Sequence, residues 1–552
     1  MYCILDYQSQ NLPSVCLPEA AVGTTLDSFP EASEDEIRKV IMNSPSKSCM
    51  LDPLPTWLAK GCLTELIPLI TNIVNTSMST GTVPDSFKVA HVTPALKINS
   101  DTGRNCLANY RPISNLSFVS KALERIVLSR FMDHLVQENL LEPYQSAYKT
   151  GHSTETALNA VHNFITTNLD KDRYVLSVLL DSSSAFDTVN HAMLLRRLQS
   201  KYGLRETVLS WFNSYITQRY QHVKIGDVLS SPRPLSTGVP QGSVLGPVLF
   251  SLYIAELSDV IRHHGVHFHH YADDTQLLLA FNKDDVPNSF RKMETCISAV
   301  NNWLTTNQLK LNCGKTKFTV FRSRFSDITT VFPPLNVGND SITISSFVRN
   351  LGAYFDQTMS LDKHVFNFCR SANWKLRKIS LMRSYLDNKT CEILVHAFVT
   401  SKLDFLNSLL YGLPQSSIRK FQKIQNTAAR IVKRKGKYCH ITPLLKELHW
   451  LPISYRIEYK ILLLTFRAYY LEQPTYLSQL LLPYTPPRTL RSSHKSYLTV
   501  PNPRLKTYGY RSLNYSAAYL WNKLPDSVRT CTELSTFKRT LKTHLFICSF
   551  ID

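Results

Sequence analysis

The sequence lacks several features that would place it in common protein classes. Its 12 cysteines, scattered from Cys3 to Cys548, include no Cys-x-x-Cys pair. Neither a disulfide framework nor a zinc knuckle is therefore indicated, and the thiols are expected to be reduced. No apolar run approaches the roughly 18 residues of a membrane span, and no N-terminal signal pattern is present. We expect a soluble intracellular protein with no membrane partner, in the nucleus or the cytoplasm.

Acidic residues are few relative to basic ones. The chain has 42 Asp and Glu against 62 Lys and Arg, which gives a formal charge of +20 and a pI of about 9.4. Such a balance favours polyanionic partners, because each neutralised phosphate releases counterions. Residues 419–437 contain no acidic side chain, and their apolar residues recur at helical spacing. This predicts a helix with one packed face and one basic face, which either follows a nucleic-acid backbone or is simply solvated.

Two adjacent carboxylates, Asp273 and Asp274, stand where the apolar residues 266–280 have to fold back on themselves. Neighbouring carboxylates repel each other, so a fold keeps them together mainly where divalent cations share the site. The alternative is an ordinary solvated turn. Upstream, the buried-strand pattern of residues 176–180 ends on Asp181. Two-metal phosphoryl transfer requires carboxylates that converge from separate strands, and we expect Asp181, Asp273 and Asp274 to meet that requirement.

Other residues lie between or beside these acidic sites. Residues 238–247 form a glycine-rich segment whose backbone can approach a flat partner such as a base pair. Histidines cluster before the acidic pair, and His267 and His269 would share one strand face. Because Mg²⁺ prefers oxygen, and no cysteine or further acidic residue stands at metal-site spacing, a separate histidine metal site is not favoured.

Three segments of the sequence resemble motifs of a known family and occur in the same order as those motifs. The segments are Leu180-Asp181 with Ala185-Phe186-Asp187, Pro240-Gln241-Gly242-Ser243 with Leu245-Gly246-Pro247, and Tyr271-Ala272-Asp273-Asp274-Thr275-Gln276-Leu277. They resemble the three central palm motifs of reverse transcriptases, specifically those of LINE-type, jockey-like non-LTR retrotransposons. Residues 109–114 with 121–125 and 145–149 with 151–154 resemble finger motifs, residues 309–312 with 315–317 a fourth palm motif, and residues 350–352 the primer grip.

The resemblance implies an α+β fold, a right-hand polymerase with fingers, an antiparallel-sheet palm and a helical thumb, followed by a mostly helical C-terminal region. It implies that Asp181, Asp273 and Asp274 are catalytic and bind two Mg²⁺ ions. It also implies that the ring of Phe186 lies under the sugar of the incoming nucleotide, where it leaves no room for a 2′-hydroxyl.

Further substrate contacts follow from the same motifs. Gln241 and Gly242 match residues that lie against the nascent base pair, and Lys149 and Arg111 match basic finger positions near the triphosphate. Asp187 fits the motif, but we expect it to be a carboxylate at a helix N-terminus or in a salt bridge and give it no metal role.

The expected organisation divides the chain into consecutive segments. Local patterns predict a capped helix opening at Ser33, strands at residues 91–96, 318–321 and 348–355, and helices at 192–198, 293–307 and 365–382. The segments are a loose N-terminus (1–30), a helical extension (31–86), fingers (87–173), palm (174–356), thumb (357–438) and a C-terminal region of unknown role (439–552), with the reverse transcriptase domain at about 87–356.

The implied function is RNA-directed DNA polymerisation, with an RNA template, a DNA primer and deoxynucleoside triphosphates as partners. Two alternatives stay open: a catalytically inactive, nucleic-acid-binding remnant of such an element, and a group II intron maturase-like enzyme. Full-length relatives usually carry an endonuclease domain before the polymerase, and about 30 residues leave no room for one here. We therefore expect a polymerase fragment that lacks the endonuclease.

Overall fold

The computed structural model describes residues 24–97, 105–183, 185–326, 330–338, 340–485 and 496–551. The chain divides into two units, each assembled from separate stretches of sequence. Unit 1 combines Met1–Glu142, Ser182–Val260 and Val300–Leu311, and unit 2 combines Pro143–Asp181, Ile261–Ala299 and Asn312–Asp552. Of the loose segment expected at residues 1–30, residues 1–23 lie outside the described residues. The segment boundaries expected from the sequence stay a prediction.

Unit 1 combines helices with a small mixed sheet. The sheet has the order β2-β1-β5-β6, with β7 paired to β5, and β1 runs antiparallel to β2 but parallel to β5. The elements are α1 (Glu34–Met42), α2 (Thr56–Gly61), α3 (Leu63–Thr80), η1 (Asp85–Phe87), β1 (Val89–Leu96), η3 (Leu107–Asn109), β2 (Tyr110–Asn115), α4 (Phe118–Gln137), β4 (Ser182–Ser183), η4 (Ala185–Asp187), α6 (His191–Ser200), α7 (Glu206–Ile216), β5 (Tyr220–Ile225), β6 (Val228–Leu229), β7 (Arg233–Pro234), α8 (Gly246–Ile254) and β10 (Lys310–Leu311).

The local patterns read from the sequence set these elements. Helix α1 begins as predicted, because Ser33 Oγ accepts a hydrogen bond from the Glu36 N–H at 3.2 Å. At the centre of unit 1 the fully buried Trp211 lies edge-on to Phe29 and stacks on Tyr215. These apolar side chains hold α7 in the core.

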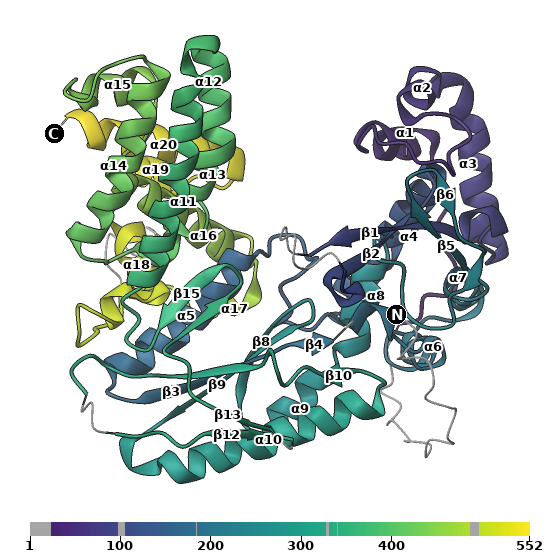
Figure 1. Cartoon of the computed structure of the whole chain (residues 1–552), viewed down its shortest axis with the longest axis horizontal. Coiled ribbons are helices and arrows are strands. Elements are labelled where there is room, and N and C mark those ends of the chain that lie inside the picture. Colours follow the sequence, from purple (N-terminus) through teal and green to yellow (C-terminus); the bar gives the residue numbers. More distant parts are fainter. Residues whose placement is uncertain are drawn as a thin grey trace. The chain divides into compact units, whose positions relative to one another are not determined.

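Four antiparallel strands form the main sheet of unit 2, in the order β11-β3-β9-β8. Helices α5 (Thr154–Asp170) and α10 (Val286–Thr306) lie on opposite sides of this sheet (Figure 1). Val175 shares a core with Leu158 of α5, whereas Phe318 contacts Phe290 of α10. The expected antiparallel sheet and the α+β class are therefore confirmed. The strands are β3 (Tyr174–Leu180), β8 (His267–Tyr271), β9 (Asp274–Phe281) and β11 (Lys317–Phe321).

Unit 2 continues with two strand pairs and a helical region. One hydrophobic core joins α5 and the sheet to these helices, and it includes Val175, Leu376, Ile461 and Ala517. The expected helical character of this region is confirmed. The elements are β12 (Leu335–Val337), β13 (Asp340–Ile342), β14 (Phe347–Asn350), β15 (Ala353–Asp356), α11 (Asp362–Leu381), η6 (Arg383–Tyr385), α12 (Asn388–Val395), η7 (His396–Thr400), α13 (Ser401–Leu403), η8 (Asn407–Leu410), α14 (Gln415–Val432), α15 (Ile441–Glu447), α16 (Ile453–Tyr470), α17 (Thr475–Ser478), η9 (Gly509–Arg511), α18 (Leu513–Lys523), α19 (Asp526–Arg529) and α20 (Leu534–Ile551).

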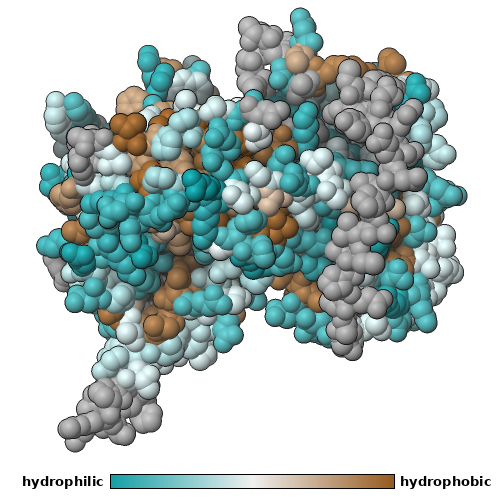
Figure 2. Space-filling model, turned by 90° about the horizontal axis from the view of Figure 1, so that it is seen from below, coloured by the Kyte–Doolittle hydropathy of each residue, from teal (hydrophilic) through white to brown (hydrophobic). Residues whose placement is uncertain are grey.

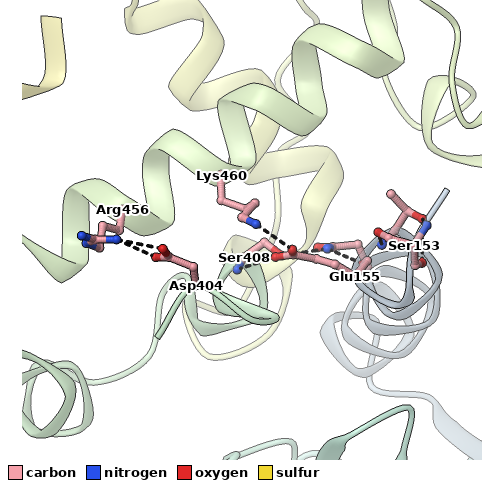
Figure 3. A network of polar contacts seen from close by, with 8 residues as sticks. Ser153, Glu155, Asp404, Ser408, Arg456 and Lys460 are labelled. Atoms are coloured by element: carbon pink, nitrogen blue, oxygen red, sulfur yellow. Dashed lines mark hydrogen bonds and ion pairs between the residues drawn. The ribbon is translucent and has the colours of Figure 1, made fainter. Parts of the chain in front are cut away.

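A buried polar network fastens the helices after the sheet to α5 (Figure 3). The carboxylate of Glu155 accepts hydrogen bonds from the Ser408 N–H and hydroxyl at 3.2 and 2.6 Å, and Lys460 of α16 lies 3.1 Å from its other oxygen. Beside it, Arg456 pairs with Asp404 at 2.9 Å. Because Glu155 is buried and fully compensated, these contacts favour one packing of α16 on α5.

One predicted strand is different in the structure. Residues 348–355 were expected to be a single short strand, but they form the antiparallel pair β14 and β15. The chain reverses at Leu351 and Gly352, which both have positive φ, 43° and 94°. Glycine adopts such a φ without steric cost, and it made the turn possible inside an otherwise strand-like pattern.

The surface is mixed in hydropathy. Hydrophilic side chains cover much of the face shown in Figure 2, with apolar patches between them. Among the described residues, no helix is both long and apolar enough to cross a membrane.

Candidate active site

The β8–β9 hairpin and the end of β3 bring the acidic residues to one edge of the unit 2 sheet. Tyr271 pairs with Asp274 across the hairpin, so Ala272 and Asp273 form its two-residue turn. Leu180, the last residue of β3, pairs with Thr275 of β9. Asp181, the next residue along the chain, therefore leaves β3 at the same edge of the sheet as Asp273 and Asp274. The convergence predicted from the sequence is present within unit 2.

The pKa of Asp274 reflects its two acidic neighbours. Burial and the negative charges of Asp273 and Asp181 raise the pKa of Asp274 from 3.8 to about 6, whereas Lys315 lowers it. Asp274 lies at the surface, yet the surrounding protein still desolvates its carboxylate. Like charges that raise a neighbour's pKa in this way provide a site that favours a cation.

The fourth palm motif provides a cation and a backbone contact for Asp181. Lys315 Nζ lies 3.4 Å from Asp181 Oδ2, and the Asn312 N–H donates a hydrogen bond to the Asp181 carbonyl at 2.8 Å. Asp181 Oδ2 is shielded from solvent and has no hydrogen-bond partner among the described residues. Lys315 therefore compensates charge without forming a hydrogen bond, and this oxygen keeps its capacity to bind a metal ion.

These residues fit Mg²⁺ as a shared site. Among the described residues, no group of three or more His, Cys, Asp or Glu side chains is arranged to hold a metal ion by itself. Mg²⁺ does not need such a group, since it keeps several waters and binds one or two carboxylates together with substrate phosphates. The oxygen-only donors, the crowded charges and the shielded Asp181 oxygen agree with such a site.

Unit 1 holds most of the residues predicted to contact the nucleotide, with Lys149 in unit 2 as the exception. The half-buried ring of Phe186 stacks on Phe250 of α8, with centroids 4.4 Å apart and an interplanar angle of 22°. The Phe186 carbonyl accepts a hydrogen bond from the Val239 N–H at 2.9 Å. Its ring is therefore supported from one side, and the glycine-rich segment fixes its backbone.

The structure shows a contact of Asp187 that was not expected. This residue ends the three-residue helix η4, which is a single turn. Its Oδ1 accepts a hydrogen bond from Gln241 Nε2 at 2.9 Å, and burial raises the pKa of its carboxyl group. Asp187 thus orients the amide of Gln241, a link that the spacing of the two residues in sequence does not reveal.

Gly242 is required for a close approach between two backbone segments. Its φ is +123°, and a Cβ there would lie 2.5 Å from the carbonyl oxygen of Ser114 in β2. The Ser114 N–H also donates a hydrogen bond to the Gln241 carbonyl at 2.7 Å. The glycine was expected to make room for a base pair, and within unit 1 it also makes room for β2.

The basic residues are less concentrated than the sequence suggested. Arg111 is exposed in β2 of unit 1, and Lys149 is half-buried in unit 2. In the predicted basic helix, α14, the first turns expose Arg419, Lys420 and Lys423. The cations at its end serve local contacts, since Arg430 bonds the Cys439 carbonyl, Lys433 pairs with Glu447 and Arg434 bonds the Leu386 carbonyl.

Buried polar contacts surround the acidic hairpin, and sequence reasoning assigned none of them. His269 and His270 in β8 contact Ser146 and Thr275 at 2.8 and 2.9 Å, and burial lowers the pKa of both rings. Asn350 of β14 donates to Gln276 at 2.7 Å. Each contact joins residues far apart in sequence or leaves no periodic signal.

Known proteins show what this arrangement is similar to. Residues 99–361 match the family model described as "Reverse transcriptase (RNA-dependent DNA polymerase)". The chain is 25% identical over 431 residues to "Probable RNA-directed DNA polymerase from transposon BS" of Drosophila melanogaster, covering 75% of this chain and 46% of the relative. It is 23% identical over 413 residues to "RNA-directed DNA polymerase from mobile element jockey" of the same species, covering 72% and 43%.

The chain spans less than half of the length of each of these two relatives. A solved structure, "Structure of apo telomerase from Candida Tropicalis truncated from C-terminal domain", aligns with a TM-score of 0.35 at 14% identity, over 50% of this chain and 55% of the other. That score is too low to relate the two folds.

Proposed function

We propose that this chain, whose residues 99–361 form a reverse transcriptase domain, is an RNA-directed DNA polymerase from a non-LTR retrotransposon. The observation that carries the proposal is the gathering of Asp181, Asp273 and Asp274 at one edge of the unit 2 sheet, where two of them raise the pKa of the third. The proposed partners are an RNA template, a DNA primer and deoxynucleoside triphosphates.

The three carboxylates are proposed to hold two Mg²⁺ ions. When bound, these ions activate the primer 3′-hydroxyl and stabilise the departing pyrophosphate. Asp273 and Asp274 are presented by a hairpin and Asp181 by a neighbouring strand, so their side chains are oriented by regular backbone hydrogen bonds. Rigid elements of this kind keep the ligands in place between turnovers.

The nucleotide-contacting residues are proposed to select the substrate. The ring of Phe186, supported by Phe250, would occupy the space of a ribose 2′-hydroxyl. Gln241, oriented by Asp187, and Gly242 would lie against the new base pair. Lys149 and Arg111 would neutralise triphosphate charge, and the exposed cations of α14 would follow the nucleic-acid backbone.

Primer extension on an RNA template with Mg²⁺ and deoxynucleotides tests the proposal. The chain should extend the primer, and Asp273→Asn should lower incorporation by at least ~10³-fold, because a metal ligand is lost. Asp284→Asn is a matched control, since Asp284 is an exposed carboxylate in η5 (Lys283–Asp285), which follows the other end of β9. It should extend primers at the rate of the unchanged chain.

The result separates the remaining alternatives. Extension that is equal in the unchanged chain and in Asp273→Asn contradicts the catalytic assignment. Tight binding of RNA without any extension identifies a nucleic-acid-binding remnant. Extension restricted to one structured intron RNA, with no activity on unrelated templates, indicates the maturase-like enzyme.

A further inference from the structure

One distant side chain holds the backbone immediately before Asp273. The Ala272 N–H donates a hydrogen bond to Gln145 Oε1 at 3.0 Å, and Gln145 Nε2 donates to the Ala272 carbonyl at 3.2 Å. Gln145 is 3% exposed. Ala272 has a φ of +55°, a left-handed conformation that costs a non-glycine residue energy. Two hydrogen bonds from one amide therefore fix the turn that presents the carboxylates.

The residues around Gln145, here called the Gln145 segment (residues 144–147), also pair with β8. The His270 N–H donates to the Tyr144 carbonyl at 2.9 Å, and the Ser146 N–H donates to the His270 carbonyl at 3.0 Å. The Ala147 N–H donates to Gln145 Oε1 at 3.0 Å. The glutamine side chain is thus held on the same strand that leads into the acidic turn.

A tyrosine from the C-terminal region contacts the Gln145 segment. Tyr476 of α17 is 4% exposed, and its hydroxyl lies 2.7 Å from Ser146 Oγ and 2.8 Å from Thr156 Oγ1. Ser146 Oγ in turn lies 2.8 Å from His269 Nε2. The ring of Tyr476 also stacks on Tyr144, at 6.2 Å and 18°.

The hydrogen bonds that link Thr156, Tyr476, Ser146 and His269 have only one consistent assignment of donors and acceptors. Thr156 Oγ1 donates to the Ser153 carbonyl at 2.9 Å, so it accepts the proton of Tyr476. The Tyr476 oxygen then accepts from Ser146, whose single proton is used, and His269 must donate through Nε2. Every hydroxyl is satisfied, which makes Tyr476 an integral part of the support of β8.

We propose that Gln145 is a positioning residue that aims Asp273 and Asp274, and that Tyr476 of the C-terminal region holds Gln145 in place. This gives residues 439–552, for which the sequence indicated no chemistry, a part in the catalytic arrangement. The kinetic consequence rests on the proposed function. The structural consequence, an acidic turn fixed by the Gln145 amide, does not.

Gln145→Met is the direct test, because methionine keeps the volume of glutamine but neither donates nor accepts these hydrogen bonds. The amide of Ala272 should exchange its hydrogen at least ~10-fold faster, because its acceptor is lost. Mn²⁺ alone, used as a paramagnetic probe, should bind at least ~10-fold more weakly. In primer extension, kcat should fall ~10- to 100-fold while the Kd for primer–template changes less than about twofold.

Gln425→Met is the matched control. Gln425 is 1% exposed and donates through Nε2 to the Leu451 carbonyl at 2.8 Å, within the helical part of unit 2. It should leave Ala272 exchange, Mn²⁺ affinity and kcat unchanged. Equal losses in the two variants overturn the proposal, because they would reflect general destabilisation. Unchanged Ala272 exchange in Gln145→Met also overturns it.

Tyr476→Phe provides a second variant if Gln145→Met does not fold. It removes one hydroxyl and should accelerate Ala272 exchange and lower kcat ~3-fold or more, because the Gln145 segment loses one support. Tyr470→Phe is its control, since the Tyr470 hydroxyl donates to the Arg529 carbonyl at 2.9 Å elsewhere in the C-terminal region. Identical behaviour of the two tyrosine variants contradicts the role of Tyr476.

The measurements separate this inference from the proposed function. If the unchanged chain does not extend primers, the proposed function fails, and hydrogen exchange and Mn²⁺ binding still decide the role of Gln145. If the unchanged chain is active and Gln145→Met retains full activity, Mn²⁺ affinity and slow Ala272 exchange, the positioning role alone fails.

Discussion

The carboxylate site of unit 2 and the residues of unit 1 that are proposed to contact the nucleotide are built in different ways. Asp181, Asp273 and Asp274 are placed by the register of an antiparallel sheet, and their charges oppose one another. Phe186 is held by its ring stacked on Phe250 of α8, and Gly242 by its close approach to the backbone of β2. The repulsion among the three carboxylates lowers the stability of the fold but favours the binding of cations. The packing around Gly242 adds no such repulsion, but it leaves no room for a larger side chain. Substitutions in the two regions should therefore alter different properties of the protein.

The largest effect is expected at the carboxylate site. Asp274→Asn should lower incorporation by at least ~10³-fold through loss of a metal ligand, while the Kd for primer–template stays within about twofold. Single-turnover extension and fluorescence anisotropy measure the two quantities. Asp340→Asn, a change at an exposed carboxylate of β13, should affect neither.

The same variant should be more stable than the unchanged chain when metal is removed. The folded pKa of Asp274 is raised to about 6 from 3.8, so its ionised form destabilises the fold above pH 6, and this cost disappears as pH falls toward 3.8. After allowance for solvent at this surface site, Asp274→Asn should raise the unfolding free energy by about 1 kcal/mol at pH 7.5 and not at pH 4. Denaturant unfolding in chelator checks this, and an equal gain at both pH values contradicts it.

In unit 1 the corresponding change should alter selectivity and leave the metal site intact. Phe186→Ala should reduce discrimination against ribonucleotides by ~10²-fold, because the space for a 2′-hydroxyl opens. The ratio of kcat/KM for deoxy- and ribonucleotides measures it. Phe186→Tyr keeps the ring and should keep the discrimination. Unchanged selectivity in Phe186→Ala shows that the ring does not lie under the sugar.

A smaller effect is expected where unit 1 has no spare volume. Gly242→Ala places a methyl group 2.5 Å from the Ser114 carbonyl oxygen at a φ of +123°. The clash and the strained backbone should lower the unfolding free energy by about 2 kcal/mol. Gly226→Ala also has a positive φ, +61°, but its Cβ meets nothing within 4 Å, so it isolates the backbone strain from the clash. Equal losses in the two variants would assign the whole effect to φ.

The broadest effect is the response of unit 2 to acid. Burial lowers the pKa of His162 and of His270 from 6.5 to about 3. These rings are neutral in the folded chain, so stability is full above pH 6.5 and decreases as pH falls from 6.5 toward 3. Each contributes a loss of about 1.4 kcal/mol per pH unit in that window. Hydrogen exchange of α5 and β8 at pH 7 and 5, corrected for intrinsic rates, should show the loss.

Much of the site could be predicted because its chemistry is local in sequence. The adjacent Asp273 and Asp274 stand in a strand–turn–strand pattern, and Asp181 ends an apolar run, so their side chains and elements followed from short windows. Phe186 and Gly242 followed from a resemblance. The role of Asp187 was missed because its partner, Gln241, comes from another loop. Local patterns cannot indicate which loops meet.

The same limit applies to the supports of the acidic hairpin. Gln145 reaches Ala272 across a separation of 127 residues, and Ser146 reaches Tyr476 across 330. A glutamine and a tyrosine have no periodicity or spacing that identifies such partners. The prediction for residues 348–355 was wrong for a related reason, because a sequence pattern typical of one strand contains a turn at Gly352.

The sequence alone determined the acidic, oxygen-rich chemistry, the strands and helices that carry it, and the excess of positive charge. It did so because hydrophobic periodicity and charge are properties of neighbouring residues. Only the tertiary structure decided that the Gln145 amide closes on Ala272, that Asp187 orients Gln241, and that Tyr476 supports β8. Buried hydrogen bonds depend on distances of about 3 Å between atoms that only the complete path of the chain brings together.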